Sequence, residues 1–383
     1  MRRTDPFDLP PQYRRLRAEQ PVARVRTPSG EAWLITRYQD VRAVLTDCRF
    51  SANPSTPGFP TFLSGDVTPP PGFFLQADEA NHARMRRAVS REFLLGHMEA
   101  LRPLMRAIVD QQLDDLLAGP VPADFIDKVA RPVSSVVICE LLGVPHSDYP
   151  FFESRIQTTL MRAGTTEEEI GAAAVELQAY IGKLVHDAIK EPGGDLLGRL
   201  VLAGDVTEEE MVGVVALLLL AGYDTVTQTT GIGLLTLLRN PDQLAALRAD
   251  PSLYPNAVDE ILRYCTANHL GLPRAARCDV EVGGIEIKAG EGVIVLIDSA
   301  NRDEAAFTDP DVFDVRRVRA PHMTFGFGFH KCIGLMMARI ELETMLRVVL
   351  TRLPGLRLAA EIDELVFRQD NLLYGVEQLP IAW

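Results

Sequence analysis

The sequence predicts a mainly α-helical fold that carries small β-sheets. Several long stretches place apolar residues at the i, i+3, i+4 spacing of a helix that buries one face. These stretches are residues 98–117, 133–142, 167–189 and 208–238. Strand-like runs are short and fall toward the two ends of the chain, so helices make up most of the expected core.

The N-terminal part begins with a strand-like run at residues 33–38, and a helix is expected to follow through Val41, Val44 and Leu45. Residues 51–76 are rich in Pro and Gly, and they predict a long irregular segment, which usually has a function inside a compact domain. Four aromatic residues lie in this segment: Phe59, Phe62, Phe73 and Phe74.

The C-terminal half continues with a helix start at residues 240–242, which read Asn-Pro-Asp. Asn is a favourable N-cap, and Pro suits the first turn of a helix. Two strands are expected at residues 280–282 and 292–297, with the Gly-Gly pair at 283–284 forming a tight turn after the first.

The composition is that of an ordinary globular protein. Of 383 residues, 47% are hydrophobic and 24% are charged, and no linker or low-complexity run divides the chain. The formal net charge of −13 argues against a nucleic-acid-binding protein, which needs concentrated basic surface. Five cysteines, an odd number without a disulfide spacing, fit a reducing compartment.

The sequence carries no pattern of an export or membrane segment. Residues 1–11 lack the apolar run of a signal peptide. The longest strongly apolar stretch, residues 211–222, is too short to span a bilayer, which takes about 20 residues. We therefore expect a cytoplasmic protein that does not bind a membrane.

The most informative stretch reads Phe-Gly-Phe-Gly-Phe-His-Lys-Cys-Ile-Gly at residues 325–334. It places Cys332 before an amphipathic helix, whose N-terminal dipole and free N–H groups favour a thiolate. Gly326, Gly328 and Gly334 are expected to adopt conformations closed to other residues and to turn amides toward the sulfur. The pattern suits a thiolate ligand of a soft metal, with a buried structural cysteine as the alternative.

The pattern Phe-x-x-Gly-x-His-x-Cys-x-Gly resembles the haem-binding signature of the cytochrome P450 family. The resemblance covers nearly the whole chain, and three further motifs follow the order that the family requires. It implies a single domain of the cytochrome P450 fold over residues 1–383, with haem b as cofactor. It also implies that Cys332 is the axial ligand of the haem iron, with Phe325 and Gly326 against the cofactor.

The first of these motifs is a Glu-x-x-Arg pair, Glu260 and Arg263, which share one helix face and can form an ion pair. Taken alone, the pair reads as a surface salt bridge worth less than about 1 kcal/mol. The resemblance implies that it lies inside the protein and braces the segment before the cysteine loop. Val312 stands where many relatives carry an Arg of this network, and Arg316 and Arg317 are the two candidates to replace it.

A second motif, Ala-Gly-Tyr-Asp-Thr, occupies residues 221–225 within a very apolar helix. Gly and Thr beside an acid favour a local break of the helix, whereas a buried Thr bonded to its own helix is the alternative. Burying a carboxylate requires a partner or a function. The resemblance implies that Thr225 hydrogen-bonds bound oxygen and that Asp224 relays protons for O–O cleavage.

A third motif places His82 and Arg86 at i and i+4, on one face of a predicted helix. Both side chains are donors suited to a carboxylate, although alone they read as surface charge. The resemblance implies that this pair, together with Arg274 and His330, holds the haem propionates.

These motifs predict a haem-thiolate monooxygenase that inserts one atom of O2 into a small apolar or amphiphilic substrate. By the resemblance, such enzymes often tailor secondary metabolites, including antibiotics. The expected pocket lining includes the Phe-rich segment and residues 217–221, 269–272 and 372–374, each of which could equally belong to the core. The sequence does not identify the substrate.

No flavin or iron–sulfur segment occurs in the chain, so electrons are expected from outside, through a ferredoxin and a ferredoxin reductase. An acidic ferredoxin is expected to dock on the side of Arg84, Arg87 and Lys331, and the protein is expected to be a monomer.

Two alternatives remain at this point. A nitric-oxide-reducing branch of the family, which takes electrons directly from NAD(P)H, looks similar at residues 240–244 and 300–303, but it lacks the acid that Asp224 supplies here. The other alternative is a non-catalytic haem protein that senses ligands or serves as a partner for other enzymes.

Overall fold

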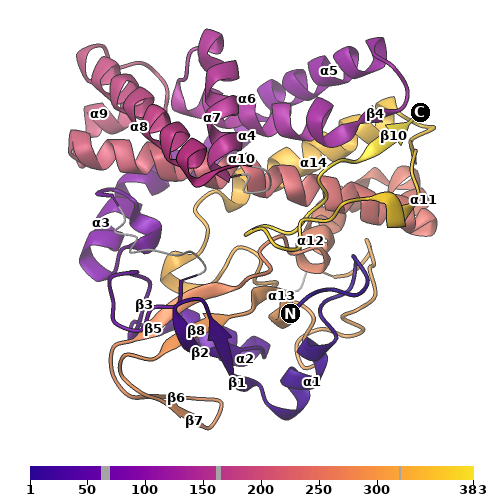
Figure 1. Cartoon of the computed structure of the whole chain (residues 1–383). Helices are drawn as coiled ribbons and strands as arrows, with labels where there is room; N and C mark the ends of the chain where they lie inside the picture. The colour runs from indigo at the N-terminus through magenta and orange to yellow at the C-terminus, as the bar shows by residue number, and fades with distance from the viewer. Residues whose placement is uncertain (62–69, 161–164, 319–320) are drawn as a thin grey trace.

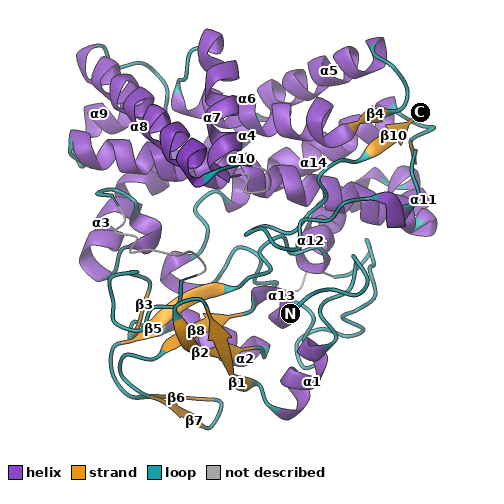
Figure 2. Ribbon diagram, viewed as in Figure 1, coloured by secondary structure: helices purple, strands orange, loops and turns teal. Residues whose placement is uncertain are grey.

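A computed structural model of the chain describes residues 1–61, 70–160, 165–318 and 321–383. A large helical layer lies above a smaller part that contains the main sheet (Figure 1), and Figure 2 shows how strongly helix outweighs strand. The prediction of a mainly helical fold with small sheets is confirmed. The predicted residue Phe62 lies outside the described residues.

The described helices run as follows: α1 Gln12–Glu19, α2 Tyr38–Thr46, α3 Glu79–Ser90, α4 Leu95–Ala100, α5 Arg102–Ala118, α6 Arg131–Leu142, α7 Tyr149–Leu160, α8 Glu167–Lys190, α9 Leu196–Ala203, α10 Glu208–Arg239, α11 Pro241–Ala249, α12 Tyr254–Tyr264, α13 Ile297–Ala300 and α14 Leu335–Arg352. The described strands are β1 Val22–Thr27, β2 Gly30–Ile35, β3 Phe50–Ser51, β4 Ala123–Asp124, β5 Leu272–Ala276, β6 Val280–Val282, β7 Ile285–Ile287, β8 Gly292–Val295, β9 Arg357–Leu358 and β10 Pro380–Ala382.

The main sheet joins distant parts of the chain in the order β1-β2-β8-β5-β3. Strands β2 and β8 pair in parallel, whereas the other neighbours are antiparallel. Smaller sheets have the order β4-β10-β9 and the pair β6-β7. The turn between β6 and β7 is tight as predicted, because Gly283 and Gly284 have φ values of 57° and 79°, which favour glycine.

Helix α10 is the centre of the helical layer and packs against α6, α8 and α14. By length and composition it is the one described helix that could cross a membrane, but 61% of its most apolar window is buried inside the protein. Thr207 and Glu210 form a capping box at its start. The helix is continuous, so the local break expected at residues 221–225 is not present.

Several predicted element boundaries differ from the structure; the strand expected at residues 33–38, for example, is β2, Gly30–Ile35. The helical stretch 98–117 divides at Leu101 into α4 and α5, with a proline in the first turn of α5. Strand β8 ends at Val295, and the short helix α13 begins two residues later. Helix α11 starts after Asn240 as predicted, but the Asn240 side chain donates to the carbonyl of Thr236, at the end of α10, instead of capping α11.

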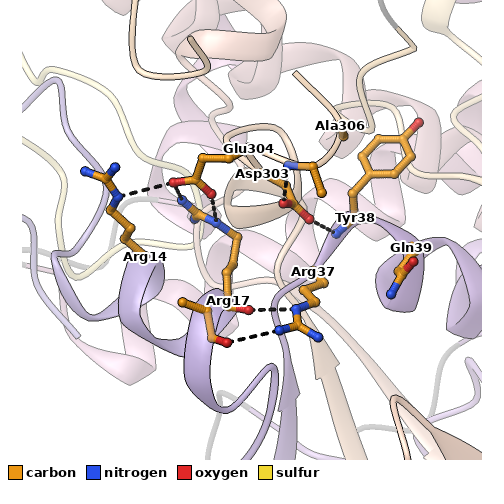
Figure 3. Close-up of a pocket in the computed structure, with 10 residues that line it drawn as sticks. Arg14, Arg17, Arg37, Tyr38, Gln39, Asp303, Glu304 and Ala306 are labelled. Atoms are coloured by element: carbon orange, nitrogen blue, oxygen red, sulfur yellow. Dashed lines mark hydrogen bonds and ion pairs between the residues drawn. The ribbon is translucent and has the colours of Figure 1, made fainter. Parts of the chain in front are cut away.

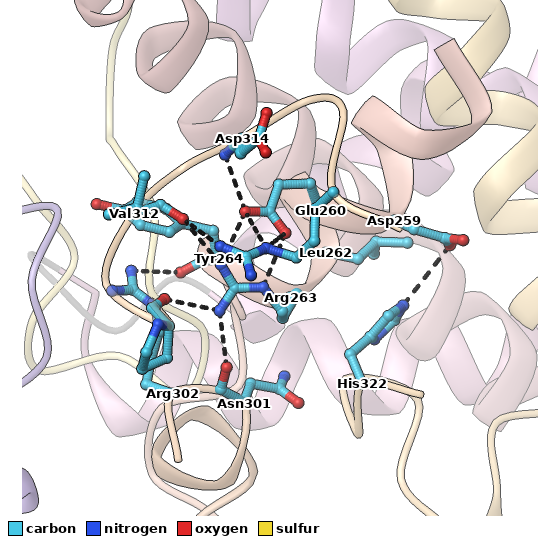
Figure 4. A network of polar contacts seen from close by, with 12 residues as sticks. Asp259, Glu260, Leu262, Arg263, Tyr264, Asn301, Arg302, Val312, Asp314 and His322 are labelled. Carbon is cyan, nitrogen blue, oxygen red and sulfur yellow. Dashed lines mark hydrogen bonds and ion pairs between the residues drawn. The ribbon is translucent and has the colours of Figure 1, made fainter. Parts of the chain in front are cut away.

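The Glu260–Arg263 pair is inside the protein, with each residue only 2% exposed. Nε and Nη2 of Arg263 each donate to Glu260 at 2.8 Å, and Nη1 donates to the carbonyls of Asn301 and Pro310 at 2.9 and 2.8 Å. Figure 4 shows these bonds converging from α12 and the following loops. The pair therefore ties α12 to the segment around residues 301–314.

Arg317 is the third member of this network. Its Nε donates to Glu260 Oε1 at 3.1 Å, and its other nitrogens donate to the carbonyls of Thr308, Asp309 and Val312. Arg316 is exposed, and its backbone N–H bonds to Asp314. The structure thus selects Arg317 from the two candidates.

We predict that Arg317→Ala lowers the free energy of unfolding by about 1–3 kcal/mol, because a buried carboxylate and three carbonyls lose donors. The neighbouring Arg316→Ala is the matched control and leaves the unfolding free energy near wild type. Urea denaturation of the purified proteins measures both. Equal destabilisation by the two substitutions would contradict the assignment of Arg317.

Candidate active site

The cysteine loop, residues 323–334, is held by its own backbone. The N–H of Cys332 donates to Phe325 O at 2.8 Å, and the N–H of Gly326 donates to Met323 O at 2.7 Å. Gly326 and Gly328 have φ values of 66° and 70°, as predicted for positions closed to other residues.

Gly328 also allows a close approach to α2, because a Cβ added there would lie 2.3 Å from Leu45 O. The expectation for Gly334 was wrong, since its φ of −81° is open to any residue. Its backbone N–H nevertheless bonds to the sulfur of Cys332, as expected for an amide turned toward the thiolate.

Asn301 links the cysteine loop to the Glu260 network. Its backbone carbonyl accepts from Arg263, while its side-chain Oδ1 accepts from the N–H of Met323 at 2.6 Å. Its Nδ2 donates to Thr266 and Thr324 at 2.8 and 2.9 Å. The buried ion pair therefore sets the starting position of the loop that carries Cys332.

The Cys332 thiol lies just before α14 and is reachable by solvent, although protein atoms surround most of it. Burial raises the pKa of the thiol, against the Gly334 N–H and the positive charges of Arg86, Arg339 and Lys331, which lower it. Coordination to a metal cation removes the proton outright. A bound metal cation would therefore make the thiolate the stable form, despite the burial.

The four predicted donors lie together. His82 and Arg86 extend from α3, Arg274 lies on β5, and His330 belongs to the cysteine loop. The rings of His82 and His330 are 4.1 Å apart between centroids. Neither His82 Nε2 nor His330 Nδ1, both buried, has a hydrogen-bond partner among the described residues.

Burial disfavours the charged form of all four donors. It lowers the pKa of Arg274 to about 10 and, together with neighbouring positive charges, that of His330 to about 3. It also lowers the pKa values of His82 and Arg86. The nearby carboxylate of Asp78 is already bonded to Ser51, Ala52 and Arg277.

The donor set therefore fits an anionic group that the described residues do not supply. A guanidinium as buried as that of Arg274 is costly without a counter-charge. Among the described residues, Arg274 donates from Nη1 to Pro273 O at 2.7 Å, and this carbonyl carries no net charge. Two carboxylates, such as the propionates of haem, supply both the negative charge and the acceptors that the four side chains lack.

Asp224 and Thr225 lie side by side on α10 but have different partners. The Thr225 hydroxyl donates to Ala221 O at 2.7 Å, so it is satisfied by its own helix. Asp224 is 8% exposed and accepts hydrogen bonds from Gln228 and from Arg368. Sequence analysis missed Arg368; the one available signal was that a carboxylate in so apolar a helix needs a cation.

Some of the residues predicted to line a pocket lie in the core, and others are exposed. Phe74, Leu217 and Tyr374 are buried in the main core, and the Tyr374 hydroxyl donates to Pro6 O. Ala221 and Leu372 are exposed. Burial lowers the pKa of His269 to about 4, and its Nε2 lies 2.7 Å from Asn371 O.

Two surface hollows are distinct from one another. The first, of about 460 Å³, lies between α1, α2 and the turn at residues 303–306, and no predicted site residue lines it (Figure 3). The second, of about 560 Å³, lies between α3 and the cysteine loop, and His82, Arg86 and Gly328 line it. Only the second borders the donor cluster.

Comparison with known proteins places the chain in one family. A family model described as cytochrome P450 matches residues 190–354. Cytochrome P450-SU2 of Streptomyces griseolus is 43% identical over 381 residues, covering 99% of this chain and 94% of that protein. Nocardicin C N-oxygenase of Nocardia uniformis subsp. tsuyamanensis is 40% identical, with 98% and 96% covered.

A solved structure agrees with these sequence matches. The crystal structure of cytochrome P450 MoxA from Nonomuraea recticatena superimposes with a TM-score of 0.94 at 41% identity, covering 100% of this chain and 97% of that one. The chain therefore belongs to the cytochrome P450 family. Its cofactor is haem b, and it is a monooxygenase.

We predict that Gly328→Ala sharply lowers the fraction of purified protein that carries thiolate-ligated haem. The added Cβ would collide with the backbone of α2 and disfavour the positive φ. Gly334→Ala is the matched control, because its Cβ would meet nothing closer than 3.9 Å. The absorbance ratio of haem to protein, with the reduced carbonyl spectrum, measures both. Equal haem content in the two variants would contradict this view of the loop.

Proposed function

We propose that this cytochrome P450 uses Cys332 as its axial thiolate and oxygenates a small apolar or amphiphilic compound. The supporting observation is a group of four donors assembled from separate elements beside the cysteine loop: buried His82 and Arg274, and half-buried Arg86 and His330. We also propose that residues 1–383 form one cytochrome P450 domain.

The reaction is R–H + O2 + 2 e⁻ + 2 H⁺ → R–OH + H2O. When bound, haem supplies the redox centre that activates O2 and is tuned by its thiolate ligand. The four donors bind and orient its propionates, while Phe325 and Gly326 pack against it. Asp224 moves protons inward as a carboxylate, and the Thr225 hydroxyl, now bonded to Ala221 O, passes them on after turning from that carbonyl.

The expected electron donors are a ferredoxin and its reductase. Arg87 and Lys331 have no ion pair among the described residues. The exposed side chains Leu94 and Phe329 line the hollow between α3 and the cysteine loop. Arg84 is a weaker candidate than its sequence position indicated, because it is already paired with Glu210. An acidic protein surface complements this mixture of cations and apolar side chains.

The biological setting follows by analogy. Nocardicin C N-oxygenase is named for oxygenation of nocardicin C, and it is similar to this chain over nearly its full length. We propose a tailoring step in secondary-metabolite biosynthesis, catalysed by a cytoplasmic monomer without nucleic-acid or membrane partners.

The function is tested with ¹⁸O2. Compounds are first screened for a high-spin shift of the haem spectrum, and those that bind are incubated with NADPH, a ferredoxin and a ferredoxin reductase. We expect one ¹⁸O atom in the product. Oxidation of NAD(P)H by the isolated protein with nitric oxide, and no ¹⁸O incorporation, would instead support the nitric-oxide-reducing alternative.

The rate at which the ferredoxin reduces the protein tests the proposed partner surface. The double substitution Arg87→Ala/Lys331→Ala should slow reduction by the ferredoxin and flatten its dependence on salt. Arg15→Ala is the control, because Arg15 is exposed on α1, away from α3 in Figure 1. Unchanged reduction by the double variant would place the docking surface elsewhere.

A further inference from the structure

Asp224 has a specific cationic partner from the far end of the sequence. Nη1 of Arg368 donates to both Oδ1 and Oδ2 at 2.9 Å each. The two side chains are only 11% and 3% exposed, so the ion pair is shielded from solvent. The attraction between two charges is greater in such surroundings than at the surface, and removal of one partner leaves an uncompensated buried charge.

The segment that carries Arg368 is fixed against α10. Phe367 and Val376 form a β-bridge, and the N–H of Arg368 donates to Gly375 O at 3.0 Å. A Cβ added at Gly375 would lie 2.1 Å from Oε1 of Gln228 on α10. Close packing of these backbones therefore allows Arg368 to approach Asp224 in one register.

Two further groups surround the pair. Gln228, one turn after Asp224, donates from Nε2 to Oδ1 at 3.1 Å. On the other side, Oε1 of Glu377 lies 3.7 Å from Nε of Arg368, which has no hydrogen-bond partner among the described residues. Arg368 thus lies between a buried carboxylate and a partly exposed one, and it cannot itself release a proton.

We propose that Arg368 is the positioning residue for Asp224, and that it thereby determines how many reducing equivalents reach the product. This inference rests on the proposed role of Asp224 as the proton-relaying acid. Arg368 holds the carboxylate in one orientation, because its Nη1 donates to both carboxylate oxygens. Without the guanidinium, the buried carboxylate keeps only its hydrogen bond from Gln228 and can turn to another donor.

Loss of timely proton transfer has a defined chemical outcome. Productive turnover gives R–OH and H2O from O2, two electrons and two protons. When the acid is misplaced, the same two electrons and two protons leave as H2O2, and R–H is recovered unchanged. The effect of Arg368 on proton transfer is therefore measured by the ratio of product formed to NADPH consumed, together with the amount of H2O2 released.

The test is a double-mutant cycle on the haem-loaded enzyme with a compound that gives the high-spin shift. We expect Arg368→Gln to lower the product ratio about tenfold, less than the 10²–10⁴-fold effect of losing a catalytic acid or base. Arg368→Lys should recover most of the ratio, because it retains the positive charge. Arg368→Gln should cause no further loss in the Asp224→Asn background, since it acts through that carboxylate.

Thermal unfolding supplies a readout independent of turnover. Arg368→Gln and Asp224→Asn should each lower the Tm. The decrease in the double variant should be smaller than the sum of the two single decreases. Glu377→Gln is the matched control, because it removes the other nearby carboxylate and should keep the wild-type product ratio.

Three results would overturn the inference. The first is that Arg368→Gln retains the wild-type ratio of product to NADPH while Asp224→Asn does not. The second is that the two losses multiply in the double variant, which would make the role of Arg368 structural and independent of Asp224. Wild-type coupling in Asp224→Asn would remove the role of Asp224 itself. Failure of the monooxygenase assignment is separate, because the wild-type protein would then incorporate no ¹⁸O.

Discussion

The buried carboxylate of Glu260 is the constraint on which the cysteine loop depends. It accepts hydrogen bonds from Arg263 of α12, and from Arg317 and the N–H of Asp314 in the loop that follows α13. Arg263 then holds the backbone of Asn301, and the Asn301 side chain holds Met323. The Glu260–Arg263 ion pair thus fixes the start of the loop that carries Cys332, through the hydrogen bonds of Asn301.

The donor cluster differs from this network in one physical respect. Around Glu260, the carboxylate and the guanidinium groups of Arg263 and Arg317 find their hydrogen-bond partners within the protein, so the network stabilises structure and needs no ligand. Around Arg274, the one nearby carboxylate among the described residues, that of Asp78, is already bonded to other groups, and burial lowers the pKa values of all four donors. This difference supports the proposal that the four donors hold the haem propionates, which would supply the missing negative charge.

The sequence predicted the parts that depend on local spacing. Cys332 with its glycines, the pair His82 and Arg86, and the pair Glu260 and Arg263 each lie within a few residues, where helix or turn geometry is readable. The choice of Arg317 and the Asp224–Arg368 contact required the tertiary structure, because the latter joins residues 144 positions apart. The expected break in α10 is absent, and the Thr225 hydroxyl supplements the helix by bonding to Ala221 O.

The central claim is that Cys332 binds the haem iron as a thiolate. The most direct measurement is the spectrum of the reduced carbonyl complex, compared between the wild type and Cys332→Ser at equal haem content. The account predicts a thiolate-type spectrum for the wild type and its loss in the variant. A histidine-type spectrum for the wild type, or a thiolate-type spectrum that persists in Cys332→Ser, would contradict it.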